Sequence, residues 1–216
     1  MKKVLTLLLI TLLILTGCNN KEETKVGSWK DDMNSKQLTI NNDALKAYKE
    51  ATKDYKDKEL EAVALLGEQV VAGTNYMFLC KSDTYKIVII YKNLEGKSTL
   101  ISVNNFDFTK YVNQDISYKN ENIVGGWQVT TPKEGTKLQS DIQKSFDNAI
   151  KKIQGISYIP IANLGTQIVA GTNYAILCYG TVNNNSGIYL LTLYKDLNNT
   201  DDIVSSAYID LADFNK

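Results

Sequence analysis

The sequence predicts an α+β fold with two tandem domains, each consisting of one helix packed on a four-stranded, or slightly larger, antiparallel sheet. Three observations support this prediction. Most of the chain is an internal repeat, each copy opens with a helical pattern of apolar residues, and four strand-like runs follow each helix.

The N-terminal segment has the pattern of a secretory signal. Two lysines precede the apolar run 4–15, which is shorter than the roughly 20 residues that a membrane-spanning helix needs. The run ends in Leu15-Thr16-Gly17-Cys18, where small residues precede a cysteine as a lipoprotein signal peptidase requires. We expect residues 1–17 to be a lipoprotein signal peptide, Cys18 to carry palmitate-type acyl chains, and residues 18–25 to form a tether. The expected location is extracytoplasmic, with a lipid anchor in the bacterial cell membrane.

The rest of the chain contains one unit twice. Two motifs and a cysteine recur at a constant distance of 98 residues: Val26-Gly27-Ser28-Trp29 as Val124-Gly125-Gly126-Trp127, Gln69-Val70-Val71-Ala72-Gly73 as Gln167-Ile168-Val169-Ala170-Gly171, and Cys80 as Cys178. The distance then rises to 103, because five residues are added in the loop-like stretch 181–187. A unit of this length can bury its own core, so we predict separate domains at 26–112 and 124–216, joined by a linker at 113–123.

Each copy is predicted to begin with a helix and to continue as a sheet. Apolar residues at three- and four-residue spacing form one helical stripe in each copy: Ile40, Ala44, Tyr48, Ala51 and Tyr55, then Leu138, Ile142, Phe146, Ala149 or Ile150, and Ile153. Apolar, β-branched and aromatic runs predict the strands: 60–70, 74–81, 85–92 and 98–106, then 156–168, 172–180, 187–195 and 203–210. Turn residues between the runs indicate hairpins, with the helix covering one face of the sheet.

The composition excludes several classes of function. The chain has no histidine and no arginine, which removes histidine-based catalysis and histidine metal sites. Without its signal segment the chain has 24 − 2 = 22 basic residues against 24 acidic ones, and the lysines stand among acids, so we expect no nucleic-acid partner. Paired carboxylates remain a route to acid–base chemistry, but these acids have the pattern of a solvated surface. We therefore predict that the protein is not an enzyme and needs no cofactor or metal.

The two cysteines that remain after lipidation are predicted to be small buried residues. Strand alternation places Cys80 with Tyr76 and Phe78 on one face, opposite Met77 and Leu79. Equivalent positions in two domains lie far apart, so a disulfide between Cys80 and Cys178 is not expected.

In its order of elements and in its motifs, the chain resembles the cystatins, most closely the single-domain stefins. The residues that carry this resemblance are the Val26-Gly27 segment, the helix after it, and the hairpin tip 69–73 followed by Thr74-Asn75-Tyr76. The pattern occurs twice and covers nearly all of the chain from Gly27 onward. The resemblance implies cystatin-like domains that inhibit papain-like cysteine proteases, as an uncleaved wedge in the active-site cleft.

The resemblance also implies three contacts in each copy. The glycine segment would lie in the non-primed subsites, the first hairpin tip over the catalytic centre, and a second hairpin tip on the primed side. Carried over, the protease-binding residues are Gly27, Gln69, Val70, Val71, Ala72, Gly73 and Leu94, then Gly125, Gln167, Ile168, Val169, Ala170, Gly171 and Leu197. The family's second tip has Pro-Trp or Leu-Pro, whereas here only the leucine is retained, so a weaker primed-side contact is expected.

Two interpretations of function remain open. In the first, the chain is a protease inhibitor, and its target belongs to the host, to a competitor or to the same organism. In the second, it is a non-inhibitory surface lipoprotein that uses the same fold to bind another protein or a ligand. Exposure of the tip 70–73 beside the Gly27 segment favours the inhibitor, and burial of the tip against the other domain favours the binding module.

Overall fold

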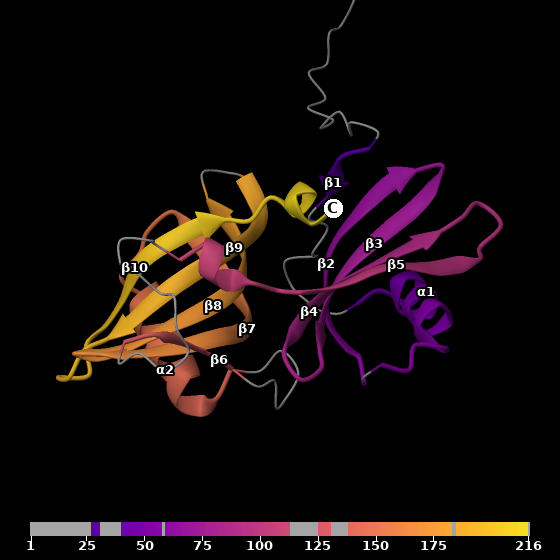
Figure 1. Ribbon diagram of the computed structural model, residues 1–216. Coiled ribbons are helices and arrows are strands. Elements are labelled where there is room, and N and C mark those ends of the chain that lie inside the picture. Colours follow the sequence, from indigo (N-terminus) through magenta and orange to yellow (C-terminus); the bar gives the residue numbers. More distant parts are fainter. Residues whose placement is uncertain are drawn as a thin grey trace, which may run out of the picture.

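The structure, a computed structural model, describes residues 27–30, 40–57, 59–112, 125–130, 138–182 and 185–215. The predicted signal peptide, the lipidated Cys18, the tether and the linker 113–123 lie outside these residues. The described part contains two five-stranded antiparallel sheets, two α-helices and two short 3₁₀ helices (Figure 1).

The two repeats have the same order of elements. The first contains β1 (Trp29–Lys30), α1 (Asn42–Thr52), β2 (Glu61–Val71), β3 (Gly73–Lys81), β4 (Tyr85–Lys92), β5 (Ser98–Asn105) and η1 (Phe108–Lys110). The second contains β6 (Trp127–Val129), α2 (Ser140–Ile150), β7 (Ile156–Val169), β8 (Gly171–Val182), β9 (Asn185–Lys195), β10 (Asp201–Tyr208) and η2 (Leu211–Phe214). Each sheet follows chain order, β1-β2-β3-β4-β5 and β6-β7-β8-β9-β10.

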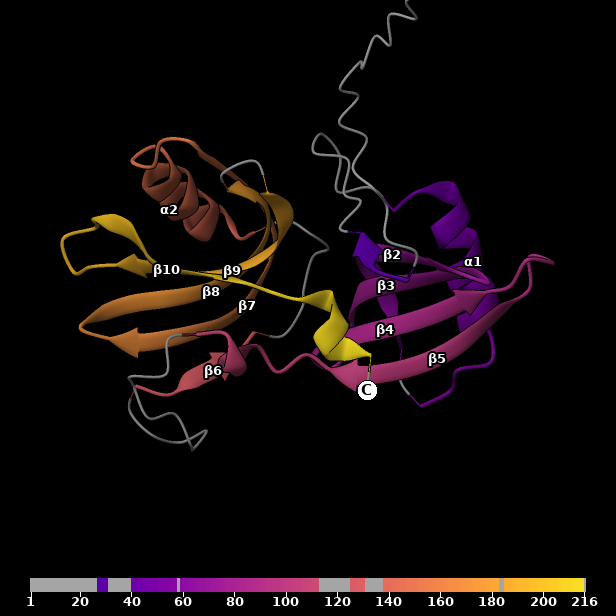
Figure 2. The ribbon, with the colours of Figure 1, turned by 90° about the horizontal axis from the view of Figure 1, so that it is seen from above.

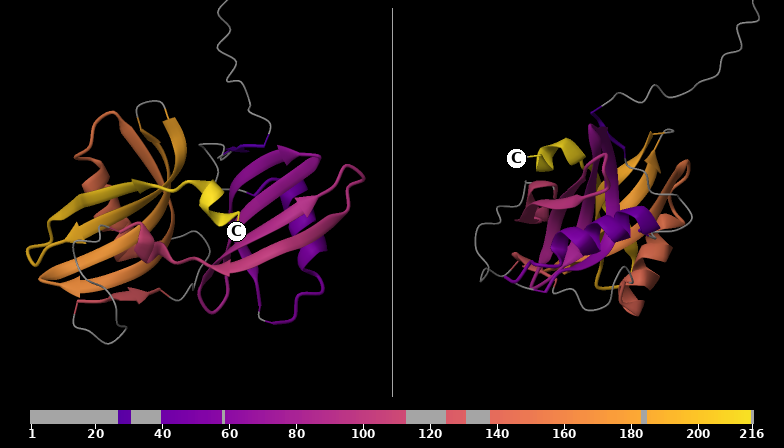
Figure 3. Two further views of the ribbon diagram at one scale, coloured as in Figure 1. Left: turned by 45° about the horizontal axis from the view of Figure 1, so that its top comes forward. Right: turned by 90° about the vertical axis from the view of Figure 1, so that its right-hand side faces the viewer.

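The predicted strands and helices are confirmed within a few residues, and so is the alternation in β3. Tyr76, Phe78 and Cys80 pack with Ala44 and Tyr48 of α1, which crosses one face of the first sheet (Figure 3, right). Met77 and Leu79 pack on the opposite face. The predicted loop at 181–187 is wrong in part, because Thr181 pairs with Ser186 and Val182 with Asn185, so the added residues lengthen β8 and β9.

The predicted fold class, two cystatin-like helix-on-sheet domains of class α+β, is wrong. The structure is mostly sheet, with 52% strand and 18% helix, and it does not divide into two separate helix-on-sheet domains. The faces of the two sheets that the helices leave uncovered share one hydrophobic core, which includes Met77 and Leu79 of the first sheet and Leu177 and Tyr179 of the second. The physical reason is that a sheet apolar on both faces needs cover on both, and each helix covers only one.

The missing cover comes from the ends of the repeats. Each repeat ends in a crossing segment, residues 106–112 in the first and 209–215 in the second, which leaves its own sheet and lies on the other repeat. In Figure 3 (left) the yellow η2 lies over the strands of the first sheet, and the pink η1 lies over the second sheet.

Glycines in the receiving strands make room for the crossing segments. A Cβ at Gly165 would collide with Phe108 Cζ, and a Cβ at Gly67 would lie 2.5 Å from Leu211 Cδ1. Phe108 also meets Trp127 edge-to-face, with ring centroids 5.6 Å apart. Phe108 and Leu211 therefore occupy equivalent places, each in the repeat to which it does not belong.

The two crossing segments also touch each other. The rings of Phe106 and Phe214 meet edge-to-face at 5.6 Å, and the Tyr111 hydroxyl donates to Asp213 Oδ2 at 3.4 Å. The exchange is thus reciprocal, and the repeats depend on one another for cover. Within the described ranges, no helix combines the length and the apolarity needed to cross a membrane.

Candidate functional site

One end of each sheet gathers the residues that the sequence predicts for partner binding. At the first edge, Gly27 adjoins the β2–β3 hairpin tip (Val70–Gly73), and the β4–β5 tip that carries Leu94 lies at the same end, because Thr74 pairs with Lys92. The second edge is built in the same way from Gly125, the β7–β8 tip (168–171) and the β9–β10 tip with Leu197.

A glutamine bridge fixes the glycine segment to the hairpin at both edges. Gln69 Nε2 donates to the Gly27 carbonyl at 2.7 Å, and Asn75 Nδ2 donates to Gln69 Oε1 at 2.6 Å. The Gly27 amide donates to the Val70 carbonyl at 3.1 Å. These bonds join the Gly27 segment to both strands of the β2–β3 hairpin.

The second edge repeats this bridge in a more buried form. Gln167 Nε2 donates to the Gly125 carbonyl at 2.6 Å, and Asn173 Nδ2 donates to Gln167 Oε1 at 2.7 Å. Gln167 is 0% exposed, so its side chain holds the glycine segment in place and offers no surface to a partner.

The hairpin tips are tight and are closed by a tyrosine. Gly73 and Gly171 have φ values of 130° and 128°, a conformation that favours glycine, and a Cβ there would collide with the carbonyls of Lys92 and Lys195. The hydroxyls of Tyr91 and Tyr194 donate to the carbonyls of Ala72 and Ala170. Sequence reasoning missed both tyrosines, although they recur at the 103-residue distance of the second half of each repeat.

Apolar side chains project from both edges. The exposed fractions are 47% for Val70 and 37% for Val71, against 56% for Ile168 and 38% for Val169. At the second tips Leu94 is 85% and Leu197 78% exposed. Exposed apolar residues are unremarkable singly, but their clustering on rigid tips is typical of a protein-binding surface.

The β9–β10 tip is organised by a carboxylate, and the β4–β5 tip by an amide. Asp196 Oδ1 accepts from the amides of Asn198 and Thr200, at 2.8 and 2.7 Å. Asn93 Oδ1 accepts from Glu95 and Lys97 in the same way. The Thr200 amide and then the Asn198 amide lower the pKa of Asp196 from its ordinary 3.8.

This difference predicts that acid acts on the acceptor of the turn amides at the tip carrying Leu197, and not on the Asn93 acceptor of the other tip. A carboxyl whose pKa is lowered by folding stabilises the fold above its unfolded pKa, and that contribution is lost as the pH falls through the folded value. In an NMR titration the chemical shifts of the Asn198 and Thr200 amide protons should change with a midpoint below pH 3.8. The Asn93 carbonyl, which organises the other tip, does not titrate. A midpoint at or above 3.8, or the same midpoint in an Asp196→Asn variant, would contradict this assignment.

The two edges lie at opposite ends of the molecule. The β2–β3 and β4–β5 tips end on one side and the β7–β8 and β9–β10 tips on the other, in two perpendicular views (Figures 1 and 2). The crossing segments lie between them, so neither hairpin tip is covered by the other repeat.

Cys80 and Cys178 take no part in either edge. Both are free and fully buried, as predicted, and Cys80 Sγ donates to the Tyr48 hydroxyl at 3.8 Å. Burial raises the pKa of Cys80 to about 12 and that of Cys178 well above its usual value, so neither is a thiolate near neutral pH. Among the residues that the structure describes, no three His, Cys, Asp or Glu side chains gather to hold a metal. The absence of a cofactor stays a prediction.

The chain matches no known family model. No curated protein matches its sequence either. The resemblance to the cystatins therefore stays a prediction that depends on the motifs and their order.

Proposed function

We propose that the protein inhibits papain-like cysteine proteases and that each edge enters the active-site cleft of one protease. The observation that supports this proposal best is the Gly27 segment, which is hydrogen-bonded to Gln69 and Val70 at an exposed hairpin tip. The glutamine bond recurs at the second edge, between Gln167 and the Gly125 carbonyl. The tips are exposed at the ends of the molecule and are not buried between the repeats.

The physical properties of the edges suit an inhibitor. The glutamine bridge and the tyrosine cap fix each tip before binding, so little conformational entropy is lost when a partner binds. Val70 and Ile168 are β-branched and have few rotamers to lose. The tips are also tightly turned and are therefore unlike the extended strand that a protease cleaves.

Two further parts of the proposal depend mainly on the sequence. The contact on the primed side is reduced to Leu94 and Leu197, which lie on exposed tips without the family's proline or tryptophan. Anchoring through Cys18 would place the inhibitor on the outer side of the bacterial membrane, where it meets proteases of a host, of a competitor or of its own cell.

Because the edges lie at opposite ends, we expect one chain to bind two protease molecules at once. The test is a titration of papain with a soluble chain that begins at Asn19, followed by residual activity and by calorimetry. The expected result is inhibition with two proteases bound per chain.

Single substitutions should separate the two edges. Val70→Glu places a charge on the exposed first tip, and Ile168→Glu places one on the second. Each substitution is expected to lower the affinity of its own edge by about 30-fold or more. The number of proteases bound per chain should then fall from two to one. The double variant should not inhibit. Ile101→Glu on β5 is the matched control, because Ile101 is 57% exposed and lies outside both edges.

Two results would count against the proposal. A folded parent chain that leaves papain and a lysosomal cathepsin fully active at micromolar concentration would favour the non-inhibitory surface module. Inhibition that survives the double variant would place the binding surface away from the tips.

A further inference from the structure

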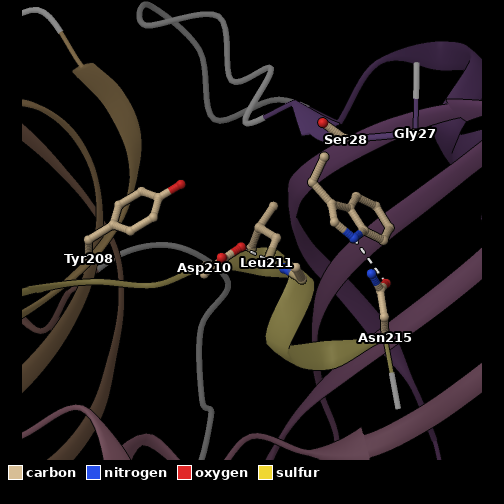
Figure 4. Close-up of a pocket in the computed structure, with 8 residues that line it drawn as sticks. Gly27, Ser28, Tyr208, Asp210, Leu211 and Asn215 are labelled. Atoms are coloured by element: carbon tan, nitrogen blue, oxygen red, sulfur yellow. Dashed lines mark hydrogen bonds between the residues drawn. The ribbon is translucent and has the colours of Figure 1, made fainter. Parts of the chain in front are cut away.

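A groove opens beside the first edge, at the junction of the two repeats (Figure 4). Its volume is ≈ 280 Å³, and it lies between Gly27, Ser28 and Trp29 of the first repeat and the end of the second repeat, from Tyr208 to Asn215. This volume is just below the roughly 300–1,000 Å³ of small-molecule sites and is suited to one side chain.

The other half of the molecule shows what fills the equivalent place. There Phe108 stands where the groove has Leu211, and Val112 stands where the groove has Asn215. Phe108 and Val112 belong to the shared core together with Trp127, which is only 8% exposed. The groove therefore exists because smaller or more polar residues replace two core residues, which leaves Trp29 half-buried.

The groove has an acidic and aromatic lining. Asp210 lines it with Tyr208, Ser28 and Trp29, and none of the lining residues is basic. Asp210 Oδ1 accepts from the Ala212 amide at 2.9 Å, which fixes the carboxylate. The Trp29 indole N–H donates to Asn215 Oδ1 at 2.9 Å, the dashed line in Figure 4, which fixes the indole in the wall.

We propose that this groove binds a basic side chain, arginine or lysine, of the protein held at the first edge. A carboxylate beside aromatic rings is the combination that attracts a guanidinium or ammonium group, through a charge-assisted hydrogen bond and cation–π contact. Gly27 belongs to both the groove and the first edge, so a partner chain that contacts Gly27 reaches the groove. The identity of the partner rests on the proposed function, whereas the preference of the groove for a cation does not.

The test uses N-acetyl-arginine amide as the probe and its uncharged analogue, N-acetyl-citrulline amide, as the control. The chain has two tryptophans, so NMR of the indole N–H groups reports on Trp29 in the groove and on the buried Trp127 as an internal reference. We expect a saturable shift of the Trp29 signal at millimolar arginine amide, at least tenfold weaker binding of the citrulline amide, and no change at Trp127.

Two variants locate the response. Asp210→Asn keeps an acceptor for the Ala212 amide and should weaken binding of the arginine amide about tenfold, whereas Asp107→Asn at the equivalent place of the other half should not. The pair Leu211→Phe and Asn215→Val fills the groove with the residues that already pack in that other half, and should abolish the response.

Equal responses to the two amides, or a response that persists in Asp210→Asn and in the filled variant, would overturn the proposal. The Val70→Glu and Ile168→Glu double variant separates this test from that of the proposed function, because it should lose inhibition and keep the arginine response.

Discussion

Replacing Phe108 with alanine is expected to destabilise the second repeat, although Phe108 belongs to the first repeat in sequence. The side chain is 2% exposed, fills the space above Gly165 and meets Trp127 edge-to-face. Loss of a buried phenylalanine lowers the free energy of unfolding by about 3–5 kcal/mol. Because both sheets share one core, urea unfolding followed by tryptophan fluorescence should remain a single transition at a lower midpoint.

Hydrogen exchange shows which strands the Phe108→Ala substitution destabilises. Amide protons of β7 and β8 should exchange faster in Phe108→Ala, by as much as those of β3. Leu94→Ala is the control, since Leu94 is 85% exposed and its loss should change the free energy of unfolding by less than about 0.5 kcal/mol. Faster hydrogen exchange confined to the first sheet would show that the repeats are independent. It would contradict the packing of each crossing segment on the other repeat.

The strands were predictable because alternation is a local signal. Tyr76, Phe78 and Cys80 face one way and Met77 and Leu79 the other, and this period of two is visible in the sequence without knowledge of what covers either face. The helical stripes are visible for the same reason, since the period of 3.6 depends only on neighbouring residues.

The shared core was not predictable in the same way. A crossing segment such as 106–112 is too short to show a period, and its contact at Gly165 is far away in sequence. The sequence does contain a signal, because Gly67 recurs as Gly165 and Phe106-Asp107-Phe108 recurs as Ile209-Asp210-Leu211. A duplication preserves both features in each copy and therefore does not reveal that each copy packs on the other.

The position of the candidate site was predictable from the sequence, but the hydrogen bonds that hold it together were not. The structure brings Gly27 to Val70, and Gly125 to Gln167, as the order of motifs suggests. The roles of Tyr91 and Tyr194 were hidden, because an aromatic residue at the end of a strand run has the same pattern as a core residue. That Gln167 is buried as a bridge depends on the paths of β6 and β7, which the motif alone does not give.

Gly171→Ala is expected to destabilise the chain by about 2–6 kcal/mol and to remove inhibition at the second edge. The residue has a φ of 128°, and an added Cβ would collide with the Lys195 carbonyl and lie 2.8 Å from Tyr194 Cε2. Strain at such a φ is about 1–3 kcal/mol, and overpacking adds about 1–3 kcal/mol. Because Tyr194 holds the Ala170 carbonyl, a displaced ring releases the tip as well.

Gly155→Ala separates backbone strain from collision. Gly155 has a φ of 74°, but a Cβ there would meet nothing within 4 Å, so alanine should lower the free energy of unfolding by only about 1–2 kcal/mol. Thermal unfolding of both variants, with papain titrations of each, gives the comparison. If Gly171→Ala unfolds at the same temperature as Gly155→Ala and inhibits with unchanged stoichiometry, the tip tolerates rearrangement. The second edge would then bind by adapting to its partner, and the rigidity that supports the inhibitor proposal would be absent.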